Sequence, residues 1–169
     1  MPDLSLDLHP ENPADSPAIE RLHERAFGPG RFARTAFRLR EGVEPFTDLC
    51  FIARVGTLLV GSIRLSPVVI GQDVQAILLG PITIDPSFQS RGIGAALMKR
   101  SLDVAKAKGH RLVILVGDAP YYNRFGFRVV PHGRLTLPGP VDPARLLVAE
   151  LIEGAFDGVA GPVKGARAN

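Results

Sequence analysis

One short segment constrains the fold of this chain more than any other: residues 89–95, which read Gln89-Ser90-Arg91-Gly92-Ile93-Gly94-Ala95. The segment stands between a predicted strand and a predicted helix. Two glycines at such a junction allow a tight turn and leave the backbone N–H groups at the start of the helix uncovered by side chains. Because the helix dipole adds positive partial charge there, the segment predicts a binding site for a phosphate or pyrophosphate group.

The elements on both sides of this segment follow from hydrophobic patterning. Residues 74–84 predict a long strand that ends at Asp85-Pro86. Gly80-Pro81 interrupts this strand, and because proline has no N–H to donate to a neighbouring strand, we expect a bulge there. Residues 92–108 carry apolar side chains at helical spacing and predict a helix, with Gly109 as its C-terminal cap.

The rest of the chain adds shorter elements. One helix is predicted to begin at Asn12-Pro13 or Ser16-Pro17 and to end at Gly28-Pro29-Gly30. The other predicted elements are a helix at 31–40, a helical turn at 120–125, and strands at 4–8, 49–55, 58–69, 111–116, 128–130 and 146–152. This order, with antiparallel hairpins first and a βαβ crossover in the second half, predicts an α/β fold with a mixed, mostly antiparallel central sheet and flanking helices. The 169 residues are expected to form a single domain over 1–169, with about 155–169 as a loose, Gly- and Ala-rich tail.

Composition and charge exclude several classes of protein. Hydrophobic residues make up 46% of the chain, which is enough for a full core. The one cysteine, Cys50, cannot form an internal disulfide or a cysteine-based zinc site, and the four histidines lack the spacing of metal ligands, so no metal is expected. A net charge of +3 and the lack of tryptophan do not favour a nucleic-acid surface. No segment resembles a signal peptide or approaches the ~20 apolar residues of a membrane span, so we expect a cytoplasmic protein without membrane contact.

Three phosphate-binding motifs can be compared with the glycine segment. A P-loop needs a lysine followed by serine or threonine, which is missing here. A dinucleotide-binding fingerprint needs a third small residue where Leu97 stands, and an acidic residue about 20 positions on, where Val113 and Leu115 occur. The third motif, Q/R-x-x-G-x-G/A, matches residues 89–94 at every fixed position. Residues 121–127 are similar to a second segment of the same family, Y-x-[KR]-x-G-F, so the chain resembles the GNAT N-acetyltransferases.

The resemblance implies that acetyl-CoA is the cosubstrate. In this family the pantetheine arm lies beside the bulged strand, so the backbone of Ile82, Thr83 and Ile84 is expected to bind it. A backbone N–H near Ile82 is expected to polarise the thioester carbonyl. Arg91 either adds a direct charge to the pyrophosphate site or is a solvated loop residue. The backbone N–H groups expected to hold the pyrophosphate are those of Gln89, Ser90, Arg91, Gly92, Ile93, Gly94 and Ala95.

The resemblance also implies catalytic roles. Tyr122 aligns with the tyrosine that serves the family as general acid for the leaving thiolate, and a shift of one residue would give that role to Tyr121. Full proton transfer from a phenol of pKa ~10 to the thiolate of a thiol of pKa ~8.5 is uphill, so close positioning must contribute. Asp118 stands nearest to the position of a family asparagine, whose role is not assigned to it. The proton of the amine is removed either by a chain of water molecules or by one of three carboxylates, Glu41, Glu44 and Asp48. The same carboxylates can instead be surface charges without a role in the reaction.

The function implied is an N-acetyltransferase in which a primary amine, on a small molecule or a protein, attacks the thioester directly. The walls of the acceptor site are expected from residues 28–45 and 131–143. The alternative is a non-catalytic acyl-CoA-binding or sensing module of the same fold, and a third hypothesis links the acetyltransferase to nucleic acid. Many members pair through their C-terminal strands, so a homodimer is a further expectation. An acidic group on the acceptor is suggested by Arg31, Arg34 and Arg38.

Overall fold

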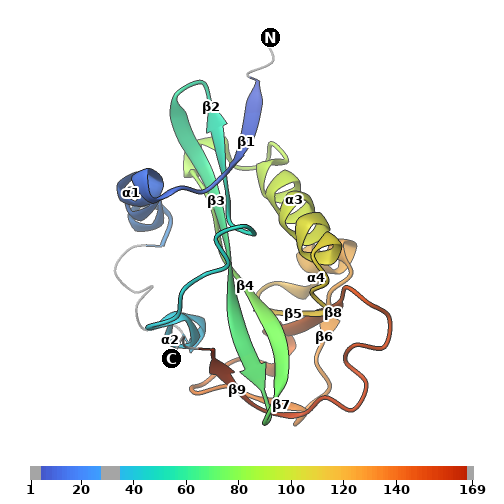
Figure 1. The fold of residues 1–169 in the computed structure, drawn as a ribbon. Coiled ribbons are helices and arrows are strands. Elements are labelled where there is room, and N and C mark those ends of the chain that lie inside the picture. The colour runs from blue at the N-terminus through green and yellow to red at the C-terminus, as the bar shows by residue number, and fades with distance from the viewer. Residues whose placement is uncertain (1–4, 28–34, 167–169) are drawn as a thin grey trace.

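The computed structural model describes residues 5–27 and 35–166, in which nine strands form one sheet (Figure 1). Seven of them lie in the order β1-β2-β3-β4-β5-β8-β6, and β9 pairs with both β3 and β7. The strands are β1 (Leu6–Pro10), β2 (Phe51–Val55), β3 (Leu58–Ile70), β4 (Val74–Ile84), β5 (Leu112–Val116), β6 (Arg128–Val129), β7 (Leu135–Thr136), β8 (Leu146–Glu150) and β9 (Gly161–Gly165). The α-helices are α1 (Ser16–Phe27), α2 (Thr35–Arg40), α3 (Ile93–Ala107) and α4 (Ala119–Tyr122).

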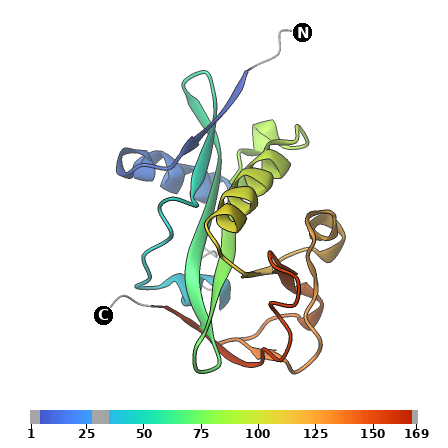
Figure 2. The ribbon, with the colours of Figure 1, turned by 45° about the vertical axis from the view of Figure 1, so that its right-hand side comes forward.

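The sheet is mixed and mostly antiparallel. Among the described strands, β4 with β5 and β7 with β9 are the parallel pairs, and the other neighbours are antiparallel. Helix α3 covers one face of the sheet, while α1 and α2 lie on the other side (Figures 1 and 2). The predicted fold class is therefore confirmed. Of the predicted helix at 31–40, residues 35–40 form α2; Arg31, Arg34 and the predicted helix end at residues 28–30 lie outside the described residues.

The long strand β4 carries the predicted bulge. Ile82 of β4 pairs with Ile63 of β3, and Leu79 pairs with Leu65, so Gly80 and Pro81 together face the single residue Arg64. Gly80 has φ +132°, a backbone conformation that residues with a Cβ rarely adopt. The bulge lies at the point where β4 and β5 separate: they pair only at Ile77–Val113 and Leu78–Ile114 in the described chain. Beyond that point residues 79–84 of β4 have no partner on the β5 side, and a split opens in the sheet.

Helix α3 begins directly at the glycine segment. Gly92 is its N-cap residue with φ +78°, no side chain caps the helix, and Ser90 also has a positive φ of 65°. The backbone N–H groups of the first turn therefore have no partner within the helix and point out of its N-terminus. At the other end Lys108 is the C-cap residue and Gly109 has φ +89°, as the sequence predicts.

The prediction of a loose C-terminal tail is wrong for residues 155–166. Strand β9 pairs antiparallel with β3 and parallel with β7, a strand inside a stretch where the sequence gives no strand signal. Phe156 is 2% exposed and packs in the core against the β5–β8 side of the sheet. Arg134 donates hydrogen bonds to the backbone carbonyls of Val159 (2.9 Å) and Phe156 (2.7 Å). The segment is ordered by partners distant in sequence, which its Gly- and Ala-rich composition does not reveal.

This ordering predicts a large stability effect at Phe156. We expect Phe156→Ala to lower the free energy of unfolding by about 3–5 kcal/mol, because a fully buried phenyl ring leaves a cavity. Urea denaturation measures the change. Leu58→Ala is the matched control: Leu58 is 49% exposed, so its removal should cost about 0.5 kcal/mol or less. An effect at Phe156 as small as that at Leu58 would show that residues 155–166 are not part of the core.

Candidate active site

Two pockets meet where β4 separates from β5. The smaller one, called here the glycine-loop pocket, has a volume of about 400 Å³ and lies between β4, the end of α1 and the N-terminus of α3. It is lined by nine of the ten residues that the resemblance assigns to acetyl-CoA binding: Ile82, Thr83, Ile84, Gln89, Ser90, Gly92, Ile93, Gly94 and Ala95. These residues are close in sequence, and they line one cavity because the bulged strand and the start of the next helix lie on either side of it.

Arg91 is the predicted residue that the structure places elsewhere. It does not line either pocket, and its guanidinium carbon lies 5.2 Å from the centre of the Phe88 ring. The cation that does line the glycine-loop pocket is Arg124, which lies over the rings of Tyr121 (4.5 Å) and Phe125 (4.8 Å). Sequence reasoning missed Arg124, although it occupies the [KR] position of the Y-x-[KR]-x-G-F segment.

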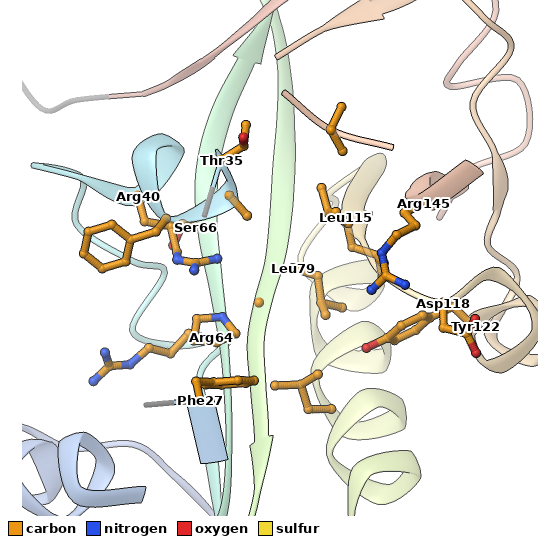
Figure 3. Close-up of a pocket in the computed structure, with 18 of the residues that line it drawn as sticks. Phe27, Thr35, Arg40, Arg64, Ser66, Leu79, Leu115, Asp118, Tyr122 and Arg145 are labelled. Atoms are coloured by element: carbon orange, nitrogen blue, oxygen red, sulfur yellow. The ribbon is translucent and has the colours of Figure 1, made fainter. Parts of the chain in front are cut away.

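The larger pocket has a volume of about 950 Å³, and its lining residues come from α1 and α2 on one side of β4 and from β5 and α4 on the other (Figure 3). It is called the large pocket below. The two segments predicted to form walls of the acceptor site contribute to it: residues 35–37, 40, 43 and 45 from the first, and residues 140–142 from the second. Helix α1, which was not predicted to contribute, adds Glu20, His23 and Phe27. Phe27, Ile82 and Tyr121 line both pockets, so the two cavities are adjacent.

The neighbouring tyrosines Tyr121 and Tyr122 are placed differently: Tyr121 lines both pockets, whereas of the two pockets Tyr122 lines the large one alone. Tyr122 lines the large pocket and reaches from α4 toward Leu79 on β4 (Figure 3). Its ring packs on Gly117, where a Cβ would stand 2.5 Å from the ring, so only glycine leaves room for this tyrosine. The hydroxyl of Tyr121 lies over the first turn of α3, 3.0 Å from where a Cβ on Gly94 would stand. The two rings meet edge to face with their centres 4.9 Å apart.

Burial raises the pKa of Tyr122 to about 12, and the nearby Tyr121 and Asp118 act in the same direction while Arg145 opposes them. The Tyr122 phenol is therefore protonated throughout the physiological range, and it can donate a hydrogen bond into the large pocket. Asp118 also lines this pocket, and its backbone carbonyl accepts hydrogen bonds from the N–H groups of Tyr121 and Tyr122 (3.1 Å each). Asp118 thus fixes the start of the helix that carries both tyrosines.

The carboxylates considered as bases from the sequence do not line either pocket. Glu41 and Glu44 are exposed, and Asp48 forms an ion pair with Lys108 at 2.7 Å, whose hydrogen bond lowers the pKa of Asp48. The large pocket instead contains the pair Glu20 and His23, with 3.8 Å between the Glu20 carboxylate and His23 Nδ1. A signal for them exists in the sequence, because positions 20, 23 and 27 recur at helical spacing beside the buried row of α1.

The remaining reactive side chains have structural roles. Cys50 is 1% exposed, and burial raises the pKa of its thiol to about 11, so it is the unreactive core residue that the sequence predicts. The His110 ring packs on Phe46 with 4.9 Å between ring centres.

Across residues 5–27 and 35–166, no three His, Cys, Asp or Glu side chains gather where they could hold a metal ion. No helix in the same residues has the length and apolar character needed to cross a membrane.

Comparison with known proteins defines the class of this chain. The profile of the acetyltransferase (GNAT) domain matches residues 8–130. The N-acetyltransferase YhbS of Escherichia coli, whose own activity is uncharacterized, is 31% identical over 156 residues, which are 91% of this chain and 92% of YhbS. The chain therefore belongs to the GNAT acetyltransferase family, as residues 89–94 and 121–127 predict.

Solved structures of relatives agree with this assignment. The crystal structure of E. coli YhbS in complex with CoA matches with a TM-score of 0.82 and 29% identity, covering 98% of this chain and 92% of that one. A GNAT family acetyltransferase from Brucella melitensis, solved in complex with acetyl-CoA, matches with a TM-score of 0.62 and 28% identity, covering 91% of this chain and 99% of that one. Two relatives of the same fold thus hold CoA or its acetyl ester.

Proposed function

We propose that the protein is an acetyl-CoA-dependent N-acetyltransferase, which moves the acetyl group from the CoA thioester to a primary amine by direct attack. The observation that carries this proposal is the junction of the two pockets at the split between β4 and β5. A cosubstrate in the glycine-loop pocket and an acceptor in the large pocket would meet beside Ile82, Phe27 and Tyr121, which line both. Reaction between two bound molecules requires such a junction.

The glycine-loop pocket fits the two polar parts of acetyl-CoA. Residues 82–84 of β4 do not pair with β5, so their backbone N–H and C=O groups on that edge are available to the amides of the pantetheine arm. Thr83 is among the residues of this pocket, and its hydroxyl is buried without a hydrogen-bond partner among the described residues. The uncapped first turn of α3 suits the pyrophosphate, and Arg124 adds a charge beside it. The relatives solved with CoA and acetyl-CoA support the choice of this cosubstrate.

Ile82 and Tyr122 supply the catalytic groups in this proposal. The Ile82 N–H polarises the thioester carbonyl, the amine forms the new N–C bond, and the C–S bond breaks. With a pKa of about 12, Tyr122 lies about three to four units above a thiol, so it stabilises the leaving thiolate by donating a hydrogen bond rather than by giving up its proton completely. The amine loses one proton to water or to the Glu20–His23 pair, and the thiolate gains one from solvent.

The pH profile of acetyl transfer tests the proposal. We expect one N-acetyl product and one free CoA thiol per turnover. The rate should rise about tenfold per pH unit below the pKa of the amine, because only the neutral amine attacks. No fall should follow up to pH 10, since Tyr122, with a pKa of about 12, still carries its proton there. A falling alkaline limb between pH 8 and pH 10 would contradict the role given to Tyr122.

The second candidate is the non-catalytic acyl-CoA-binding or sensing module. A protein that binds acetyl-CoA but acetylates no amine across this pH range would favour it over the enzyme. The hydroxyl of Tyr122 in the large pocket favours catalysis, because a module that only binds CoA has no need of a proton donor there.

We place the reaction in the cytoplasm, where acetyl-CoA is made. The acceptor is a small-molecule or protein amine, and a homodimer stays a prediction.

A further inference from the structure

The last turn of helix α1 forms part of the wall of both pockets. Ala26 and Phe27 line the glycine-loop pocket, and Phe27 also lines the large pocket. Phe27 is the last residue of the helix. The shape of both cavities therefore depends on where this last turn is held relative to β4 and the glycine segment.

An ion pair holds the last turn of α1 at the end of β4. Arg25 Nη2 donates a hydrogen bond to Asp85 Oδ2 at 3.1 Å. Asp85 directly follows β4, which ends at Ile84, and it lies 60 positions from Arg25 in the sequence. The side chain of Asp85 is 12% exposed and that of Arg25 is 46% exposed, so the pair is partly shielded from water. Salt screens such a pair less than one between two fully exposed side chains.

The position of Asp85 is fixed by three further hydrogen bonds. Its Oδ1 accepts a hydrogen bond from the backbone N–H of Ser87 at 2.9 Å and caps the 3-10 turn that follows β4. Its backbone N–H donates to the carbonyl of Val60 on β3, and its backbone carbonyl accepts from the N–H of Phe88, both at 2.8 Å. Phe88 lines the glycine-loop pocket and directly precedes the glycine segment. One carboxylate thus holds both α1 and the turn that leads into the glycine segment.

We propose that Arg25 and Asp85 are positioning residues for acetyl-CoA: their ion pair holds the last turn of α1 as a wall of the glycine-loop pocket, and the affinity for the cosubstrate depends on it. The proposal rests on the function proposed above for this pocket. Neither side chain lines either pocket, so the pair acts through Ala26 and Phe27. A wall that is already in place does not have to be ordered when the ligand binds, and this raises the affinity.

The effect of position can be separated from the effect of charge, because the two predict opposite results at Asp85. The phosphates of acetyl-CoA are negative. Charge alone therefore predicts tighter binding when Asp85 loses its carboxylate, and weaker binding when Arg25 loses its guanidinium. Loss of the ion pair predicts weaker binding in both cases.

Calorimetry with acetyl-CoA on the full chain measures this effect. We expect Asp85→Asn and Arg25→Gln each to raise the Kd about fivefold, and the double variant to raise it no further, because both changes remove the same pair. Arg25→Lys should bind more tightly than Arg25→Gln. An asparagine at position 85 keeps an oxygen that can cap the turn at Ser87, so the contact with Arg25 is the one that weakens. Tighter binding in Asp85→Asn, or losses that multiply in the double variant, would overturn the proposal.

Arg54→Gln is the matched control. Arg54 Nη2 pairs with Asp15 Oδ1 at 2.9 Å, and this pair joins β2 to the residue just before α1. The two side chains are more buried than those of Arg25 and Asp85, and neither residue lines a pocket. We expect the Kd for acetyl-CoA to stay within about twofold of the unmodified protein, even if the urea midpoint falls. Equal losses of affinity in Arg54→Gln and Asp85→Asn would reflect a general loss of stability and overturn the proposal.

Folding is checked by circular dichroism. If Asp85→Asn does not fold, Arg25→Gln gives the same comparison, because Arg25 is exposed on α1 and its replacement leaves the core intact. An unchanged Kd in a folded Arg25→Gln would then overturn the proposal.

Kinetics separates this proposal from the proposed function. The acceptor is the best substrate among the L-amino acids and ethanolamine. Asp85→Asn should raise the KM for acetyl-CoA and leave kcat within about twofold, because Ile82 and Tyr122 are unchanged. A Kd that depends on the pair, in a protein that acetylates no amine, would support the positioning role and contradict the acetyltransferase. Turnover with an unchanged Kd in both single variants would support the acetyltransferase and contradict the positioning role. An unmodified protein that does not bind acetyl-CoA would contradict both.

Discussion

Replacing Tyr122 by phenylalanine is expected to lower kcat about 100-fold and to leave the affinity for acetyl-CoA nearly unchanged. The phenylalanine keeps the ring that packs on Gly117 and against Phe127, with 6.1 Å between the two ring centres, so the fold and the pocket walls remain. What disappears is the hydroxyl that faces the leaving thiolate in the proposed reaction. The loss belongs to the transition state, because charge develops on the sulfur only there. Steady-state kinetics and calorimetry with acetyl-CoA measure the two quantities separately.

Tyr121→Phe is the matched control for this prediction. It removes the same hydroxyl from the adjacent position, but that hydroxyl lies over Gly94 at the start of α3. Tyr121 lines both pockets, whereas of the two Tyr122 lines the large pocket alone. We expect kcat to change little in this variant, whereas the KM for acetyl-CoA can rise. If Tyr121→Phe loses turnover and Tyr122→Phe does not, the roles of the two tyrosines are exchanged. If neither loses turnover, the leaving thiolate needs no tyrosine.

Most of the glycine-loop pocket, where we propose that the cosubstrate binds, could be predicted from the sequence, because the signals for it are local. Proline cannot join a sheet ladder, so Gly80-Pro81 indicates a bulge, and the register of β3 against β4 confirms it. Glycines at positions 92 and 109 have positive φ values at the two ends of α3, as turn chemistry requires. Each signal lies within a few residues of the feature that it predicts, so no long-range contact was needed.

The large pocket, where we propose that the acceptor binds, was harder to predict because elements distant in sequence come together there. Glu20 and His23 from α1 and Arg145 near β8 line one pocket only because the sheet brings their elements to one side. The position of the Tyr122 ring depends on the free space above Gly117, and a sequence motif does not describe that space. Strand β9 was missed for the same reason: its pairing with β3 joins residues more than ninety positions apart, such as Val163 and Ile70.

The matched pair Gly92→Glu and Gly109→Glu isolates the effect of charge at the glycine segment. Both glycines have positive φ, +78° and +89°, and a Cβ at either position would meet nothing within 4 Å. The backbone strain is therefore similar in the two variants, of the order of 1 kcal/mol. Gly94 is a less suitable position, because a Cβ there would stand 3.0 Å from the Tyr121 hydroxyl and disturb a second residue.

Gly92→Glu is expected to weaken the binding of acetyl-CoA about 100-fold or more, while Gly109→Glu binds it like the unmodified protein. A glutamate at position 92 brings a carboxylate to the uncapped N–H groups at the start of α3, where it takes the place proposed for the pyrophosphate and repels its charge. The same carboxylate interacts favourably with the positive end of the helix dipole, so we expect α3 to keep its first turn. Calorimetry with acetyl-CoA gives both affinities. Equal losses in the two variants would point to backbone strain, and unchanged binding in Gly92→Glu would mean that the pyrophosphate does not lie at this helix.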